Sequence, residues 1–354
     1  MRPLTASLVR YLAIVAALGG VPCAAQPQQG SAPLVIARSG DLPLLISAPH
    51  GGTLAVPGSS PRKGEGQPKG ASGYFTGRDN GVEELAQETA AEVKRITGNA
   101  PYLVVASFHR KYADCNRPPS LATEDDAARA VYMEYHDAMR RACAEMVARW
   151  GGGLVIDIHG QGSSRSTVYR GTKNGLSTAT MRDRFGPGVH NGPESLIGRL
   201  AARGWTVHPE AGGREQAGFT GGYITQTYGA REMGTDAVQL EFGADFRSTP
   251  AARTAAAPIL ARTLAEMARI YLDAPRRAPA TKSDVEPPPN RRLPPPPMQP
   301  IAAGTSALGV EWCYASAGTS SGPPRAMAGA KGQPWKSSTT SRAASSSRRA
   351  PRPA

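Results

Sequence analysis

Apolar runs alternate with amphipathic stretches along the middle of the chain. Strands are predicted at apolar or alternating segments between turn-forming residues, at residues 33–38, 42–49, 102–108, 152–160, 205–210 and 237–242. Helical periodicity is present at residues 79–96, 128–150, 194–204 and 257–272. Alternation of strands and helices indicates one α/β domain with a largely parallel or mixed sheet, over residues 31–274.

The first residues, MRPLTASLVRYLAIVAALGGVPCAAQ, have the pattern of a secretory signal peptide, residues 1–25. Arg2 and Arg10 precede an apolar run, and small residues precede a cleavage site after Ala25. The apolar run is too short for a membrane span. A lipid anchor on Cys23 is the alternative, but Gly20-Val21-Pro22 matches poorly the residues that precede lipidated cysteines. We therefore expect an exported protein, periplasmic or secreted.

Residues 275–354 are rich in Pro, Ser, Ala and Arg and lack apolar periodicity, so a disordered basic tail is predicted. This tail has 12 Lys/Arg against 3 Asp/Glu, and the signal region adds two arginines. Only +2 of the net charge of +13 therefore belongs to residues 31–274. The charge gives no reason to expect that the folded body binds nucleic acid.

Several classes of site find no support in the sequence. Residues 31–274 contain no C-x-x-C pair for a thiolate zinc cluster, no G-x-S-x-G elbow of a serine hydrolase and no P-loop. Cys115 and Cys143 either form a disulfide in an oxidising compartment or remain buried free thiols. The histidines at positions 109, 136, 190 and 208 are interpreted as structural or solvated.

Two histidines follow strands in matching contexts, His50 in LLISAPHGG and His159 in LVIDIHG. Sites of α/β sheets gather beyond the carboxyl ends of strands. The glycines that follow each histidine are expected to leave room for a metal and its substrate. Zinc needs a third ligand, commonly a carboxylate. Asp79 and Glu83, expected one turn apart at the start of the next helix, are the candidates.

Further polar residues stand at other strand ends. HRKYADCNR contains Arg110, Asp114, Asn116 and Arg117, and two arginines near a metal suggest an anionic substrate. Asp114 has either a direct role or a pairing role within its loop. Glu241, inside the apolar run VQLEF, would be costly to bury without a function or a partner. Two residues before the second histidine, an aspartate at position 157 is positioned to orient that histidine or to cap a turn.

Seven motifs occur in an order that resembles the N-formylglutamate amidohydrolase family, which is related to zinc carboxypeptidases and aspartoacylases. They are SAPHGG, RDNGVEEL, FHRKYADCNR, LVIDIHG, GPESLIGRLAARGW, GGYITQTYG and VQLEF. The resemblance covers roughly residues 33–272. It implies a carboxypeptidase-like three-layer α/β/α sandwich with a mixed sheet and one zinc ion.

The resemblance also implies roles for individual residues. The metal ligands would be His50, Asp79 and His159, with Glu83 as the fallback acid. The substrate carboxylate would be held by Asn116 and Arg117, and Arg110 would face the scissile carbonyl or a second carboxylate. Glu241 would be the general base.

The expected activity is zinc-dependent hydrolysis of a linear amide in an N-acyl acidic amino acid such as N-formyl-L-glutamate. Predicted export leaves a second enzyme hypothesis, a zinc amidase or carboxypeptidase of the cell envelope that cleaves other N-acyl amino acids or peptidoglycan-derived peptides. A third hypothesis is a non-catalytic periplasmic binding module for acidic ligands.

Overall fold

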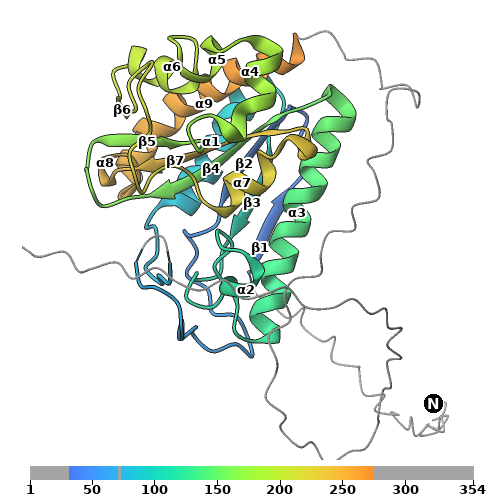
Figure 1. The fold of residues 1–354 in the computed structure, drawn as a ribbon, viewed down its shortest axis with the longest axis vertical. Coiled ribbons are helices and arrows are strands. Elements are labelled where there is room, and N and C mark those ends of the chain that lie inside the picture. The colour runs from blue at the N-terminus through green and yellow to red at the C-terminus, as the bar shows by residue number, and fades with distance from the viewer. Residues whose placement is uncertain (1–31, 71–72, 274–354) are drawn as a thin grey trace, which may run out of the picture. The chain divides into compact units, whose positions relative to one another are not determined.

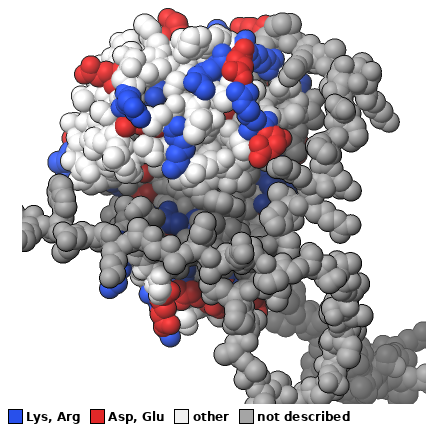
Figure 2. All heavy atoms as spheres, in the orientation of Figure 1, with Lys and Arg blue, Asp and Glu red and all other residues white. Residues whose placement is uncertain are grey.

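The computed structural model describes residues 32–70 and 73–273. The predicted signal peptide and the predicted basic tail from Pro275, with Cys313, lie outside the described residues. Among the described helices, none combines the length and apolarity that a membrane crossing requires. On the face drawn in Figure 2, basic and acidic side chains are interspersed over the described residues, in keeping with their near balance of charge.

A seven-stranded mixed sheet runs through the centre of the described chain, in the order β1-β3-β2-β4-β7-β5-β6 (Figure 1). β1 is antiparallel to β3 and β5 is antiparallel to β7, whereas the other neighbours are parallel. The strands are β1 (Val35–Arg38), β2 (Leu44–Ala48), β3 (Tyr102–Ala106), β4 (Leu154–Gly160), β5 (Thr167–Gly171), β6 (Thr206–His208) and β7 (Asp236–Phe242).

Helices cover both faces of the sheet. The longer ones are α1 (Val82–Thr97), α3 (Asp126–Trp150) and α9 (Pro250–Leu272). The shorter ones are α2 (Pro119–Ala122), α4 (Ala179–Phe185), α5 (Gly188–Asn191), α6 (Leu196–Ala202), α7 (Tyr223–Tyr228) and α8 (Ala244–Arg247). Two 3₁₀ turns cover Leu176–Thr178 and Arg231–Met233. In Figure 1, α1 and α9 pack together on one face and α3 crosses the other.

Strand residues divide between two hydrophobic cores because successive side chains of a strand point to opposite faces. Leu44 and Ile46 of β2 pack with α1 and α9, whereas Leu45 between them packs with α3. All three are fully buried. Such continuous burial is typical of strands covered on both faces. The structure therefore confirms the α/β fold class, with a three-layer α/β/α arrangement around a mixed sheet.

The elements differ from the predictions at several places, and the short helices α2, α4, α5, α7 and α8 were not predicted from the sequence. β5 was not predicted from the sequence, because its residues TVYRG contain only one aliphatic side chain. α9 begins at Pro250, seven residues before the predicted start, where the Thr249 side chain accepts a hydrogen bond from the backbone N–H of Ala252. α1 begins at Val82 because Gly81 is in the left-handed region, with φ of 80°.

Cys115 and Cys143 are both buried and both free. Of the two alternatives, the structure thus supports the unpaired thiols. Burial raises the pKa of the Cys143 thiol to about 12, so this side chain acts as a small apolar group of the core beneath α3.

Candidate metal centre and active site

The carboxyl ends of β2, β4 and β7 lie side by side and carry three of the predicted site residues. His50 follows β2, His159 is the penultimate residue of β4, and Glu241 is the penultimate residue of β7. β4 and β7 pair in parallel with His159 directly opposite Glu241. Both side chains therefore project from the same face of the sheet.

Asp79 reaches the two histidines from the loop before α1. Its backbone N–H donates to the carbonyl oxygen of His50 at 3.0 Å, and its Oδ2 accepts from the backbone N–H of Gly160 at 3.1 Å. The expected placement of Asp79 in the first turn of the helix is wrong. Gly81 is in the left-handed region, and α1 begins only after it, at Val82. Glu83 is in that first turn, and its carboxylate accepts a hydrogen bond from Ser107 at 2.7 Å.

The ligand atoms of His50, Asp79 and His159 form a nearly equilateral triangle. The two Nδ1 atoms are 3.1 Å apart, and Asp79 Oδ2 lies 3.5 Å from His50 Nδ1 and 3.4 Å from His159 Nδ1. A tetrahedral zinc ion with bonds of about 2.0–2.2 Å holds its ligand atoms about 3.3 Å apart. Two imidazoles and one carboxylate, all buried, therefore fit a zinc ion in both geometry and donor type.

The outer nitrogens of the two rings show why this triangle attracts a cation. His50 Nε2 lies 2.7 Å from Asp114 Oδ1, and His159 Nε2 lies 2.7 Å from Asp157 Oδ2. A carboxylate only accepts hydrogen bonds, so each Nε2 carries the proton and each neutral ring turns an Nδ1 lone pair inward. Two lone pairs 3.1 Å apart repel each other unless a proton or a metal ion is bound there.

The electrostatics of the cluster point the same way. Burial alone would lower the pKa of His159, but the charge and hydrogen bond of Asp157 outweigh it and raise that pKa well above its usual value. Burial would raise the pKa of Asp79, yet the two adjacent histidines bring it far below its usual range. The triangle thus stabilises positive charge, which is the requirement for a cation site.

Asp157 is expected to strengthen the metal site through His159. We predict that Asp157→Asn lowers zinc affinity by about 10- to 100-fold, the usual effect of losing a carboxylate behind a metal-bound histidine. Competition for zinc with a chelator measures this. Asp137→Asn, at an exposed acid of α3 paired with Arg140, is the matched control and should leave the affinity unchanged. Equal affinities for the two variants would contradict the predicted role.

Glu241 lies in the wall of the cavity that contains the triangle. Its carboxylate accepts one hydrogen bond, from Gln239 Nε2 at 2.8 Å. Burial raises its pKa to about 7, an effect that the charge of His159 opposes and the charge of Asp79 reinforces. A carboxyl group with this pKa both takes up and releases a proton near neutral pH, as a general base must.

The loop after β3 places the other three predicted residues in the same cavity. Arg110 Nη2 contacts Asp114 Oδ2 at 2.5 Å, and its Nη1 lies 3.8 Å from Asp79 Oδ1. Asp114 therefore serves both alternatives, since it pairs within its loop and also binds His50. Arg117 bonds the carbonyl oxygens of Gly73 and Asn116 through Nε and Nη1.

Asn116 is held by the protein on both sides of its amide. Its Oδ1 accepts from the backbone N–H of Ile224 at 2.9 Å, and its Nδ2 lies 3.3 Å from both His159 Nε2 and Gln239 Oε1. These contacts fix the wall of the cavity against β4 and β7. Its assignment to substrate binding stays a prediction.

The glycines that follow the histidines have a different purpose from the one expected. A Cβ at Gly51 would lie 2.4 Å from the backbone of Glu83, and a Cβ at Gly52 would lie 2.2 Å from the backbone of Ser107. The expectation that they leave room for metal and substrate is therefore wrong. They allow the His50 loop to pack directly against α1 and the end of β3.

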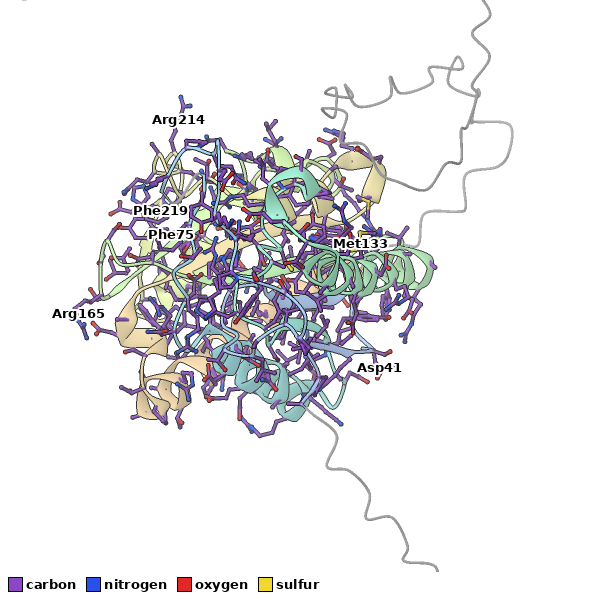
Figure 3. All side chains as sticks on the ribbon, turned by 90° about the horizontal axis from the view of Figure 1, so that it is seen from below. Asp41, Phe75, Met133, Arg165, Arg214 and Phe219 are labelled. Carbon is purple, nitrogen blue, oxygen red and sulfur yellow. The ribbon has the colours of Figure 1, made fainter. Side chains whose placement is uncertain are left out.

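The cavity has a volume of about 1080 Å³ and is open to solvent over an apolar rim. Phe75 and Leu121 belong to this rim, with 42% and 37% of their surfaces exposed. Phe219 also lines the cavity and stacks on Tyr169. Figure 3 labels Phe75 and Phe219, which both line the cavity. The Arg110 guanidinium lies 5.2 Å from the centre of the Phe75 ring.

Arg247, at the end of α8, was not singled out by the sequence, although it connects three loops of the site. Its Nε donates to the carbonyl oxygen of Phe242 at 2.9 Å and its Nη2 to that of Gln161 at 3.1 Å. Its Nη1 donates to the carbonyl oxygen of Asn80. All three acceptors are backbone atoms, which leave no signal in a sequence pattern.

Each carbonyl bound by Arg247 stands within two residues of Asp79, His159 or Glu241. We predict that Arg247→Lys lowers zinc affinity about 10-fold, because one compact ammonium cannot hold three separated carbonyls. Chelator competition measures the affinity, and circular dichroism checks the fold. Arg165→Lys, at an exposed surface pair, is the control. An unchanged affinity would show that the three loops hold their positions without Arg247.

Comparison with known proteins bears on this site. Residues 120–246 match the sequence model of the N-formylglutamate amidohydrolases, a segment that includes His159 and Glu241. The match confirms the resemblance that the motifs indicate and supports a hydrolase that acts on amides. No curated protein sequence matches the chain.

Three solved structures align with parts of the chain. The N-formylglutamate amidohydrolase from Ralstonia eutropha JMP134 is 16% identical, with a TM-score of 0.43, over 68% of this chain and 97% of that chain. A bacteriophage poly-gamma-glutamate hydrolase is 13% identical, with a TM-score of 0.34, over 68% and 89%. A metallo-carboxypeptidase from Pseudomonas aeruginosa is 15% identical, with a TM-score of 0.34, over 66% and 60%.

Proposed function

We propose that the protein is a zinc-dependent amidohydrolase that cleaves a linear amide of an N-acyl acidic amino acid, such as N-formyl-L-glutamate. The observation that carries the proposal is the triangle of His50, Asp79 and His159 beside the proton-transferring candidate Glu241. The match of residues 120–246 to the N-formylglutamate amidohydrolases supports the bond type.

When bound at the triangle, a zinc ion would supply a Lewis acid that makes water more acidic and polarises a carbonyl group. Glu241 would accept a proton from the attacking water and donate it to the departing nitrogen. Arg110, within reach of both Asp79 and the cavity, would stabilise negative charge on the carbonyl oxygen. Formate and glutamate would be the products from N-formyl-L-glutamate.

Arg117 is the proposed partner of a substrate carboxylate close to the scissile bond. Its guanidinium lies in the cavity wall and is half-buried, and a guanidinium fork matches a carboxylate in shape and charge. Burial lowers the pKa of Arg117, while the charge of Asp114 opposes that effect. The side chain remains a cation at neutral pH in either case.

The volume of the cavity favours a second candidate function. A cavity of about 1080 Å³ is slightly larger than the usual range for small-molecule sites, about 300–1,000 Å³. A formyl group occupies little of it, and the rim of Phe75, Leu121 and Phe219 suits longer apolar acyl groups or peptides. Export, predicted from residues 1–25, would give the enzyme access to peptides of the cell envelope.

A panel of N-acyl glutamates tests both candidates on the zinc-loaded protein. N-formyl-, N-acetyl- and N-octanoyl-L-glutamate should all be hydrolysed if the amidohydrolase proposal holds, and free glutamate is the product measured. Preference for the formyl compound supports the first candidate, and preference for the octanoyl compound supports the second. Binding of all three without hydrolysis would instead favour the non-catalytic binding module.

A further inference from the structure

Two neighbouring residues after β5 have an unusual backbone conformation. Lys173 and Asn174 both have φ of 52°, and no other non-glycine residue in the described ranges has a positive φ. The left-handed region is disfavoured for residues with a Cβ, although Asn adopts it more readily than most. A lysine in this conformation needs support from its surroundings, and such conformations concentrate at functional sites.

The support comes from Glu215, whose side chain is fully buried. Its carboxylate accepts hydrogen bonds from the backbone N–H groups of Thr172 and Asn174, each at 2.8 Å. It also accepts from the Thr172 hydroxyl, and from Arg170 Nε at 3.2 Å. The backbone N–H of Glu215 in turn donates to Asn174 Oδ1 at 3.1 Å. Glu215, in its buried ion pair with Arg170, thus supports the strained turn through the backbone N–H groups on both sides of Lys173.

This turn places Lys173 in the wall of the cavity that contains the metal triangle. The backbone N–H of Lys173 donates to the carbonyl oxygen of Thr220 at 2.7 Å, which joins the turn to the neighbouring wall segment. The side chain is partly exposed. Within the part of the chain that the structure describes, no carboxylate lies within 4.0 Å of its ammonium group.

A lysine ammonium group on a rigid, strained turn, with no carboxylate partner among the described residues, is arranged to bind an anion. We propose that Lys173 is a specificity-determining residue that binds the side-chain carboxylate of the substrate. This inference rests on the proposed function, and it adds a residue that the resemblance to the family did not assign. An acidic amino acid has two carboxylates. With Arg110 assigned to the carbonyl oxygen, the cavity offers two further cations for them, Arg117 and Lys173.

The test compares two substrates that differ only in this carboxylate, N-formyl-L-glutamate and N-formyl-L-glutamine, on the zinc-loaded enzyme. Lys173→Gln should lower kcat/KM for the glutamate compound by about 10- to 100-fold, the usual effect of losing a hydrogen bond between charged groups. The value for the glutamine compound should change less than about 2-fold. Lys173→Arg, which keeps the charge, should keep most of the preference for glutamate.

Lys173→Gly separates recognition from folding. Glycine adopts positive φ without steric cost, so this variant should melt no lower than the wild type and still lose the preference. An equal change of kcat/KM for both substrates, or no change for either, would overturn the proposal.

The two proposals fail in different ways. If the wild type hydrolyses neither compound, the proposed function fails. Lys173 is then judged by calorimetric binding of L-glutamate and L-glutamine. Tighter binding of glutamate that disappears in Lys173→Gln would support the residue's role as an anion site, and equal binding would overturn it.

Discussion

Replacing Glu241 by Gln is expected to lower kcat by about 10²- to 10⁴-fold while the protein keeps its bound zinc, because the amide cannot accept a proton from water. Glu241 is not one of the three candidate ligands, so metal content should equal that of the wild type. Stopped assays of amide hydrolysis and metal analysis of the same sample measure the two quantities.

The same substitution is expected to stabilise the fold at high pH. Burial raises the pKa of Glu241 to about 7 from an ordinary value of 4.5. The folded state therefore binds this proton more tightly than the unfolded state, and its stability falls as pH rises from about 4.5 through about 7. Gln does not titrate, so metal-free Glu241→Gln should melt at a higher temperature than the wild type at pH 8, with a smaller gain at pH 5.

Glu232→Gln is the matched control, since Glu232 lines the same cavity but is exposed. It should keep both the activity and the melting temperature of the wild type. Full activity of Glu241→Gln would remove Glu241 as the base. Loss of zinc from that variant would instead show that Glu241 is a ligand.

Replacing Asp79 by Ala is expected to remove the metal. The loss in zinc affinity should exceed the roughly 10- to 100-fold loss typical of residues behind the ligands, because a carboxylate of the triangle itself is lost. Hydrolysis should fall with zinc occupancy, and added zinc should restore only part of it. Metal content after dialysis against a weak chelator is the measurement.

Glu83→Gln separates the two candidate acids. Glu83 accepts a hydrogen bond from Ser107, and Gln can accept the same bond. This variant should therefore keep zinc and activity, whereas Asp79→Ala loses both. Retained zinc in Asp79→Ala together with lost zinc in Glu83→Gln would reverse the assignment.

The sequence predicted the parts of this molecule that depend on local patterns. Apolar runs of the length of LLISA and LVIDI are buried on both faces of a sheet, and the residue that follows such a strand lies at the sheet edge. The juxtaposition of His50 and His159 depends only on these two strands being neighbours and parallel. The pattern therefore places each histidine at the sheet edge, and the parallel pairing of β2 with β4 in the structure brings the two together.

The remaining parts depend on contacts between distant backbones. The choice between Asp79 and Glu83 depends on a left-handed glycine, Gly81, that stands directly before the helix and leaves Asp79 outside it, and several helix starts were consistent with the sequence. The three hydrogen bonds of Arg247 end on carbonyl oxygens, whose residue types do not matter. Long-range packing decides such features, so composition and periodicity do not show them.

The glycines after the histidines show how a correct motif can have the wrong explanation. Gly51 and Gly52 mark a site, yet their Cβ positions are occupied by the backbones of α1 and the segment after β3. The need for glycine comes from close packing of the loop, and the site benefits because that packing brings His50 next to Asp79.

The most direct test of the central claim is zinc stoichiometry combined with hydrolysis of N-formyl-L-glutamate, for the wild type and for His50→Ala and His159→Ala. We predict about one zinc per wild-type chain, activity that disappears with chelation and returns with zinc, and neither metal nor activity in the two variants. Wild-type protein that hydrolyses the amide without bound metal, or variants that keep a full equivalent of zinc, would contradict the account.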